Sequence, residues 1–123
     1  MSPSLQKACP LLAARDIDAA VRWYERHLGF RIERNQPDHG IVHRDSAELH
    51  FWRCTERHIA ENTGAYLYVS HLDELFRAFK GASEGGRLIV PETKPWGMRE
   101  FHVIDPDGNL LRFGEIAGPH AVA

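Results

Sequence analysis

The chain has 123 residues, 43% of them hydrophobic and 26% charged, which is the size and composition of one globular domain. Its 15 basic and 17 acidic residues give a net charge of −2 without a basic stripe, and no apolar run approaches the roughly 18 residues of a membrane span, so neither nucleic acid nor a membrane is an expected partner. Residues 1–7 lack the apolar core of a signal peptide, and the two cysteines form no CxxC pair, so we expect a cytoplasmic protein with reduced thiols.

The first half of the chain predicts a strand, a helix and three further strands. Residues 8–14 are predicted as a short strand, in which Pro10 implies an edge, a bend or a chain crossing because proline cannot donate to an interior ladder. A helix follows, capped by Asp16 or Asp18 and ended by Gly29. The remaining strands are predicted at 30–34, 41–44 and 47–54, with a polar loop at 35–40 and a hairpin turn at 45–46.

The second half repeats this order after a polar linker over residues 55–64. Its expected elements are a strand at 65–69, a helix at 72–79, a turn-rich break at 81–86, a strand at 87–90, a closing pair of strands within 94–115 and a frayed tail at 116–123. The closing pair turns at residues 105–109, Asp-Pro-Asp-Gly-Asn, because proline presets φ and glycine accepts a positive φ.

The two halves form an internal repeat. Asp18 and Arg22 of the first predicted helix correspond to Asp73 and Arg77 of the second, and the last strand of each half aligns in the same way. A half this small cannot bury its own sheet, so the halves are expected to pair around a shared, cupped sheet. The predicted fold class is α+β, with two paired βαβββ modules at about 8–54 and 64–115 in a single domain over 1–123 and with helices on the outside of the mixed sheet.

The order of elements and two motifs resemble the vicinal oxygen chelate superfamily, which includes glyoxalase I, extradiol dioxygenases, fosfomycin resistance enzymes and bleomycin resistance proteins. The motifs are the helix opening at 15–30 and the turn at 105–109. Within the superfamily, the segments 65–75 and 95–101, together with Pro10, are similar to the bleomycin resistance proteins.

The resemblance also indicates where a metal would bind, because metal-using members carry one ligand on the first strand and one on the last strand of each module. Those positions fall on Cys9 and Gly64 in the first strands and on His50 and Arg112 in the last ones. Glycine offers no side-chain ligand and arginine repels a cation, so we expect neither a metal nor another cofactor. A register slip of two residues would make Glu48 a candidate ligand.

With no metal expected, the inner face of the cup is predicted to be aromatic and polar. Alternation along the strand at 47–54 directs Leu49 and Phe51 to the helix side and their neighbours to the cup. Flat aromatic side chains with polar tips suit a planar, heteroaromatic ligand, although the same aromatics could pack a dimer interface or the module seam. The predicted ligand-binding residues are Glu48, His50, Trp52, Tyr66, Tyr68, Trp96, His102 and Arg112. For His102 two interpretations stay open, namely a residue of the pocket or a polar residue in a partly buried strand. No catalytic residue is assigned.

The resemblance implies a homodimer with two ligand clefts at the subunit interface, in which the first strand is exchanged at Pro10 and Trp96 contacts the ligand. The expected function is non-enzymatic sequestration of a planar small molecule or an antibiotic of the bleomycin type, which confers resistance. Bleomycin is cationic, and this chain departs from its acidic binders by carrying Arg112 in the cup.

Two alternatives stay open at the level of the sequence. One is a metal-dependent lyase, dioxygenase or thiol transferase of the same superfamily that uses Cys9, Glu48 and His50. The other is a metal-free acid–base enzyme in which Glu48 and His50, neighbours on one strand face, share a proton.

Overall fold

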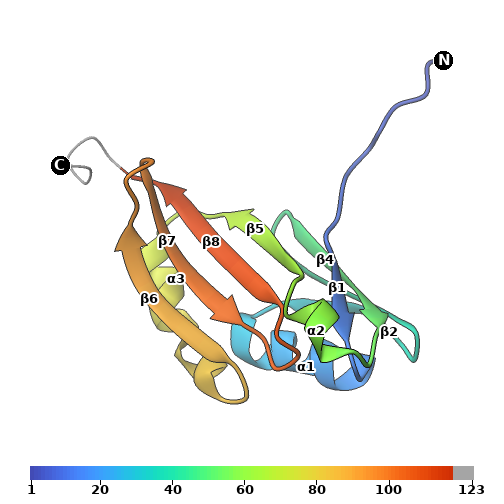
Figure 1. Ribbon diagram of the computed structural model, residues 1–123. Coiled ribbons are helices and arrows are strands. Elements are labelled where there is room, and N and C mark those ends of the chain that lie inside the picture. The colour runs from blue at the N-terminus through green and yellow to red at the C-terminus, as the bar shows by residue number, and fades with distance from the viewer. Residues whose placement is uncertain (118–123) are drawn as a thin grey trace.

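The computed structural model, described here for residues 1–117, contains two four-stranded mixed sheets (Figure 1). In the first sheet the strands lie in the order β1-β4-β3-β2, and in the second in the order β5-β8-β7-β6. Each module places its first strand parallel to its last and pairs the others antiparallel. The strands are β1 (Leu11–Ala14), β2 (Arg31–Gln36), β3 (His39–Arg44), β4 (Ala47–Arg53), β5 (Gly64–Tyr68), β6 (Arg87–Thr93), β7 (Met98–Ile104) and β8 (Leu110–Ile116). The predicted α+β class with two βαβββ modules is confirmed.

Four helical segments accompany the sheets, namely α1 (Ile17–Leu28), α2 (Arg57–Ala60), α3 (Leu72–Ala78) and the 3₁₀ turn η1 (Lys80–Ser83). Helix α1 is capped at its start by Asp16, whose carboxylate accepts the backbone N–H of Ala19 at 3.0 Å, and at its end by Gly29 in the left-handed conformation with φ of 69°. Of the two aspartates predicted as caps, Asp16 has this role, and Asp18 instead pairs with Arg22 at 2.8 Å. Within residues 1–117, no helix is long and apolar enough to cross a membrane.

Helix α3 is attached to the second sheet at its first turn. The carboxylate of Glu115 on β8 accepts the backbone N–H groups of His71 and Leu72 at 2.7 and 3.3 Å. The guanidinium of Arg99 on β7 makes a bidentate pair with Asp73 at 3.0 and 2.9 Å. The helix therefore packs on the face of the sheet that carries Arg99 and Glu115, opposite the face that carries Glu100 and His102.

Several predicted boundaries were wrong in segments where polar residues form regular secondary structure. The segment 35–40 is not a loop, because β2 runs to Gln36 and pairs with His39 across a tight turn. This strand is an exposed edge, so its polar composition gives no apolar alternation to detect. The other corrections are that β1 begins at Leu11, the linker contains α2, the break after α3 contains η1, β6 extends to Thr93, and β8 continues to Ile116. Of the remaining predicted frayed tail, Ala117 donates its N–H to the Gly97 carbonyl at 2.9 Å, and residues 118–123 lie outside the described residues.

The buried core lies between the helices and the two sheets. On the first sheet, Tyr24 of α1 packs edge-on against Phe51 of β4 at 5.0 Å between ring centroids. On the second sheet, Phe101 and Phe113 stack at 4.8 Å, and Phe79 packs edge-on against both rings. Burial of large aromatic side chains supplies most of the apolar area that stabilises so small a sheet pair.

A buried polar network joins the turn of the second module to the first module. The Asp105 carboxylate accepts the Tyr24 hydroxyl at 2.7 Å and the backbone N–H groups of the predicted 105–109 turn. The Asn109 amide donates to the Ala13 carbonyl at 2.7 Å and accepts the Ala13 N–H at 3.2 Å, so it occupies the open edge of β1 in place of a further strand. Burial raises the pKa of Asp105, against the opposing effect of the Tyr24 and Asn109 hydrogen bonds.

Candidate functional site

Strand β4 presents three of the predicted site residues on one face. Leu49 and Phe51 are fully buried against α1, and Glu48, His50 and Trp52 lie on the opposite face. Trp52 is 38% exposed, so part of its ring is open to solvent.

The polar residues of this face form a continuous hydrogen-bonded chain. Glu48 accepts the Lys7 ammonium at 2.7 Å and the His50 Nε2 at 2.7 Å, and the Cys9 thiol lies 3.5 Å from the same carboxylate. The Lys7 and His50 hydrogen bonds lower the pKa of Glu48 to about 2 against the effect of burial. Because an ionised carboxylate only accepts, the His50 Nε2 donates to Glu48, and the Nδ1 of His50 lies 3.1 Å from the Nε2 of His39. His39 was not predicted, because it falls in the segment that was assigned to a loop.

Three residues of this chain could hold a metal ion. Cys9, Glu48 and His50 each offer one ligand atom, and these atoms all lie within 4.8 Å of one another. A mixed sulfur, nitrogen and oxygen set is compatible with zinc. The corresponding strand positions of the second module, Gly64 and Arg112, supply no ligand.

The second sheet carries the other predicted residues, arranged around a carboxylate that was not predicted. Glu100 on β7 is only 4% exposed and accepts three side-chain hydrogen bonds. Its donors are the Tyr66 hydroxyl at 2.8 Å, the Trp96 indole Nε1 at 3.4 Å and the His102 Nε2 at 3.3 Å. The signal that could have identified Glu100 was its position two residues before His102 on the same strand face.

The pKa values of this group follow from its burial and hydrogen bonds. Burial, together with the hydrogen bond to the Glu100 anion, raises the pKa of Tyr66 to about 12. Burial alone would raise the pKa of Glu100, but the donors Tyr66, His102 and Trp96 outweigh it and lower this pKa. At neutral pH the group therefore contains a neutral phenol beside a carboxylate anion.

The aromatic members of the second-sheet group are strongly exposed. Tyr68 is 79% exposed and Trp96 66% exposed, and the rings of Tyr66 and Tyr68 lie 5.1 Å apart. Arg112 lies between Tyr66 and His102 in the strand register and is also exposed. A concentration of exposed aromatic side chains on one face is typical of a binding surface.

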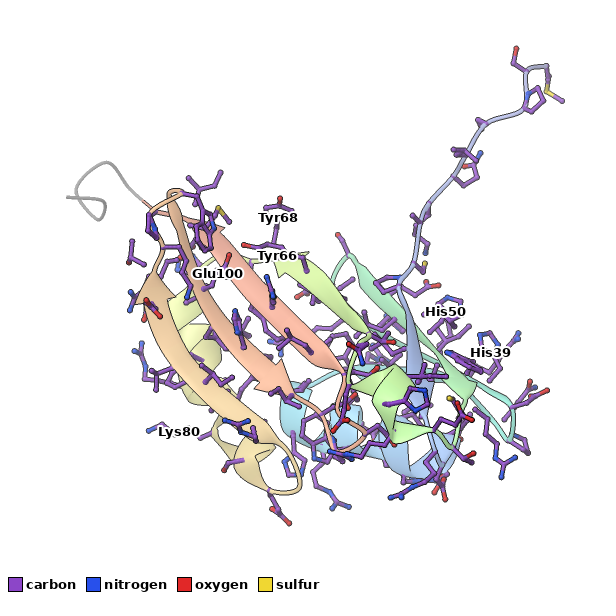
Figure 2. The ribbon with its side chains drawn as sticks, in the orientation of Figure 1. His39, His50, Tyr66, Tyr68, Lys80 and Glu100 are labelled. Atoms are coloured by element: carbon purple, nitrogen blue, oxygen red, sulfur yellow. The ribbon has the colours of Figure 1, made fainter. Side chains whose placement is uncertain are left out.

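The predicted residues thus form two groups that come from different sheets. Figure 2 shows His39 and His50 over the first sheet and Tyr66, Tyr68 and Glu100 over the second. No hydrogen bond or ion pair between the described side chains links one group to the other. A cavity of about 610 Å³ lies at the seam between β4 and β5, where Glu48, Tyr66 and Tyr68 all contribute to its lining, and the other five predicted residues do not line it.

Comparison with known proteins places the chain in a family. A sequence profile of the Glyoxalase/Bleomycin resistance protein/Dioxygenase superfamily matches residues 8–113, and the chain belongs to this superfamily. It is 32% identical over 113 residues to a bleomycin resistance protein of Klebsiella pneumoniae, an alignment that covers 86% of this chain and 89% of the relative.

Two solved structures are similar over almost the whole fold. The bleomycin-binding protein from bleomycin-producing Streptomyces verticillus, solved with copper(II)-bleomycin, superposes with a TM-score of 0.82 at 31% identity over 95% of this chain and 99% of that chain. The bleomycin resistance determinant encoded on transposon Tn5 gives a TM-score of 0.80 at 30% identity over 91% and 98%. The resemblance to the superfamily and to its bleomycin resistance proteins is confirmed.

Proposed function

We propose that this protein binds and sequesters a planar antibiotic of the bleomycin type, and so confers resistance without changing a bond of the ligand. The observation that carries this proposal is the group of exposed aromatic residues around Glu100. Trp96, Tyr66 and Tyr68 offer flat surfaces for stacking, and Arg112 and His102 offer directed polar contacts beside them. The named relatives and the copper(II)-bleomycin complex of a similar protein support the choice of ligand.

The proposed functional unit is a homodimer in which the N-terminal segment is exchanged. Residues 1–8 are exposed, and beyond the contact of Lys7 with Glu48 the N-terminal segment extends away from both sheets (Figure 1). Strand β1 pairs with β4 only over His50–Arg53, so the stretch 47–49 has no partner on this edge within the described residues. An open edge of this kind is a template for a strand from another chain, and the seam cavity adjoins it. In such a dimer, the first-sheet group of one subunit and the second-sheet group of its partner would form each ligand cleft.

The two cysteines, Cys9 and Cys54, are unpaired in the structure, which supports the proposed location in the reducing cytoplasm.

The proposal is tested by calorimetric titration of the purified protein with metal-free bleomycin and with copper(II)-bleomycin, alongside light scattering for the dimer. Trp96→Ala is expected to weaken binding by about tenfold or more, as the loss of one stacking surface predicts. Trp23→Phe is the matched control, because Trp23 lies on α1 and donates to the Glu84 carbonyl away from the cup. Equal affinity of Trp96→Ala and the control would refute the site.

The clustering of Cys9, Glu48 and His50 favours a second candidate function, metal-dependent catalysis. It is tested by zinc, nickel and ferrous ion titration of the wild type and of Cys9→Ser. Stoichiometric binding that Cys9→Ser weakens would favour an enzyme over a binding protein, and the matched control is Cys54→Ser.

A further inference from the structure

The carboxylate of Glu100 lies beneath the exposed aromatic residues of the second sheet (Figure 2). Its Oε2 atom accepts from two of them at once, the Tyr66 hydroxyl at 2.8 Å and the Trp96 indole N–H at 3.4 Å. Its other oxygen, Oε1, lies 3.3 Å from the Nε2 of His102. Glu100 is only 4% exposed, so its carboxylate oxygens bond mainly to these three side chains and little to solvent.

Gly114 provides the space in which Tyr66 reaches Glu100. In the strand register, Gly114 of β8 lies between Tyr68 of β5 and Glu100 of β7. A Cβ atom at Gly114 would overlap the Tyr66 hydroxyl, and the backbone there is not in the left-handed region, so the missing side chain matters for space and not for conformation.

The Trp96 side chain has few other restraints. The backbone of its loop is fixed by hydrogen bonds from Lys94 N–H to the Met98 carbonyl at 2.7 Å and from Gly97 N–H to the Lys94 carbonyl at 3.1 Å. Trp96 is 66% exposed, and the Lys94 ammonium lies 5.9 Å from the centroid of its ring. The hydrogen bond to Glu100 is therefore the directional contact that selects one orientation of the indole.

We propose that Glu100 is a positioning residue of the ligand-binding site, which holds the rings of Trp96 and Tyr66 in the arrangement that receives a planar ligand. This inference rests on the proposed function. Aromatic rings that are already ordered lose less side-chain entropy when a ligand stacks on them, and so bind it more tightly. Two rings bonded to one carboxylate oxygen are also fixed relative to each other, which sets the angle between the two stacking surfaces.

The test uses two ways of breaking the contact and metal-free bleomycin as the probe. Glu100→Met removes both acceptor oxygens at similar volume, and Gly114→Ala leaves the carboxylate in place but displaces the Tyr66 hydroxyl. Glu25→Gln is the charge control, since Glu25 is exposed on α1. We expect Glu100→Met to bind about tenfold more weakly, Gly114→Ala several-fold more weakly, and the control like the wild type.

The second measurement is the mobility of the Trp96 indole N–H by nuclear magnetic resonance. The chain has three tryptophans, so three indole signals are expected, and Trp96→Phe assigns the relevant one. In Glu100→Met this signal should show increased fast motion while circular dichroism shows the fold retained. Weaker binding with an unchanged indole signal would overturn the positioning role, because Glu100 would then act in some other way.

The variants also separate this inference from the proposed function. If Trp96→Ala loses affinity while Glu100→Met and Gly114→Ala bind like the wild type, the positioning role is wrong and the site stands. If Trp96→Ala itself binds like the wild type, the proposed site is wrong.

Discussion

The contact between Asn109 and the edge of β1 gives the sharpest prediction about stability. Asn109 is fully buried, and its amide satisfies both the N–H and the carbonyl of Ala13, with a further hydrogen bond to Asp105 at 2.9 Å. Asn109→Ala would leave two backbone groups buried without partners, and each such group costs about 1–3 kcal/mol. We therefore expect the free energy of unfolding to fall by about 3 kcal/mol. For a domain of this size the melting temperature should fall by roughly 10 °C.

The assay is urea unfolding followed by circular dichroism, at one fixed protein concentration because a dimer would make stability depend on concentration. Asn35→Ala is the matched control, since Asn35 is exposed and donates only to the exposed Asp18. The control should stay within about 0.5 kcal/mol of the wild type. If the unfolding free energy of Asn109→Ala also stays within this range, then the network does not stabilise the joining of the two modules and the reasoning is refuted.

Three further predictions concern the charged and phenolic groups. The pKa of Glu48 is lowered from 4.5 to about 2, so its ionised form stabilises the fold above pH 4.5 and this contribution is lost as pH falls towards 2. The unfolding free energy of Glu48→Gln should consequently change less than that of the wild type over this interval, and parallel curves would contradict the assignment. The pKa of Tyr66 is raised to about 12, and an ultraviolet titration of Tyr66→Phe should lack the ionisation of this phenol. In Glu100→Met the pKa of Tyr66 should shift towards the ordinary value near 10, and an unchanged titration curve would count against the contact. Arg99→Lys should lower stability by about 0.5–1 kcal/mol in urea unfolding, because the bidentate pair with the half-exposed Asp73 becomes a single contact, and no loss would indicate that solvent screens the pair.

Local patterns were sufficient for much of the fold. The cap residue Gly29, the turn at 105–109 and the alternation along β4 each depend on a few neighbouring residues, and each was predicted in the right place. The polar edge strand at 31–36 and the short helix α2 were missed or cut short, because neither presents an apolar face whose period could be detected.

The sequence by itself determined the order of the strands and of the two longer helices, and with it the repeat of two modules. It also determined the face on which Glu48 and His50 lie, because side-chain direction in a strand follows from a period of two residues. Only the tertiary structure decided which side chains meet. The contact of Tyr66 with Glu100 crosses β8 and depends on the strand register and on the empty space at Gly114. The contact of Glu48 with Lys7 depends on where the N-terminal segment passes over the first sheet. Such contacts join residues far apart in the chain, and they arise only when two or more strands have found their partners, so no local pattern of residues records them.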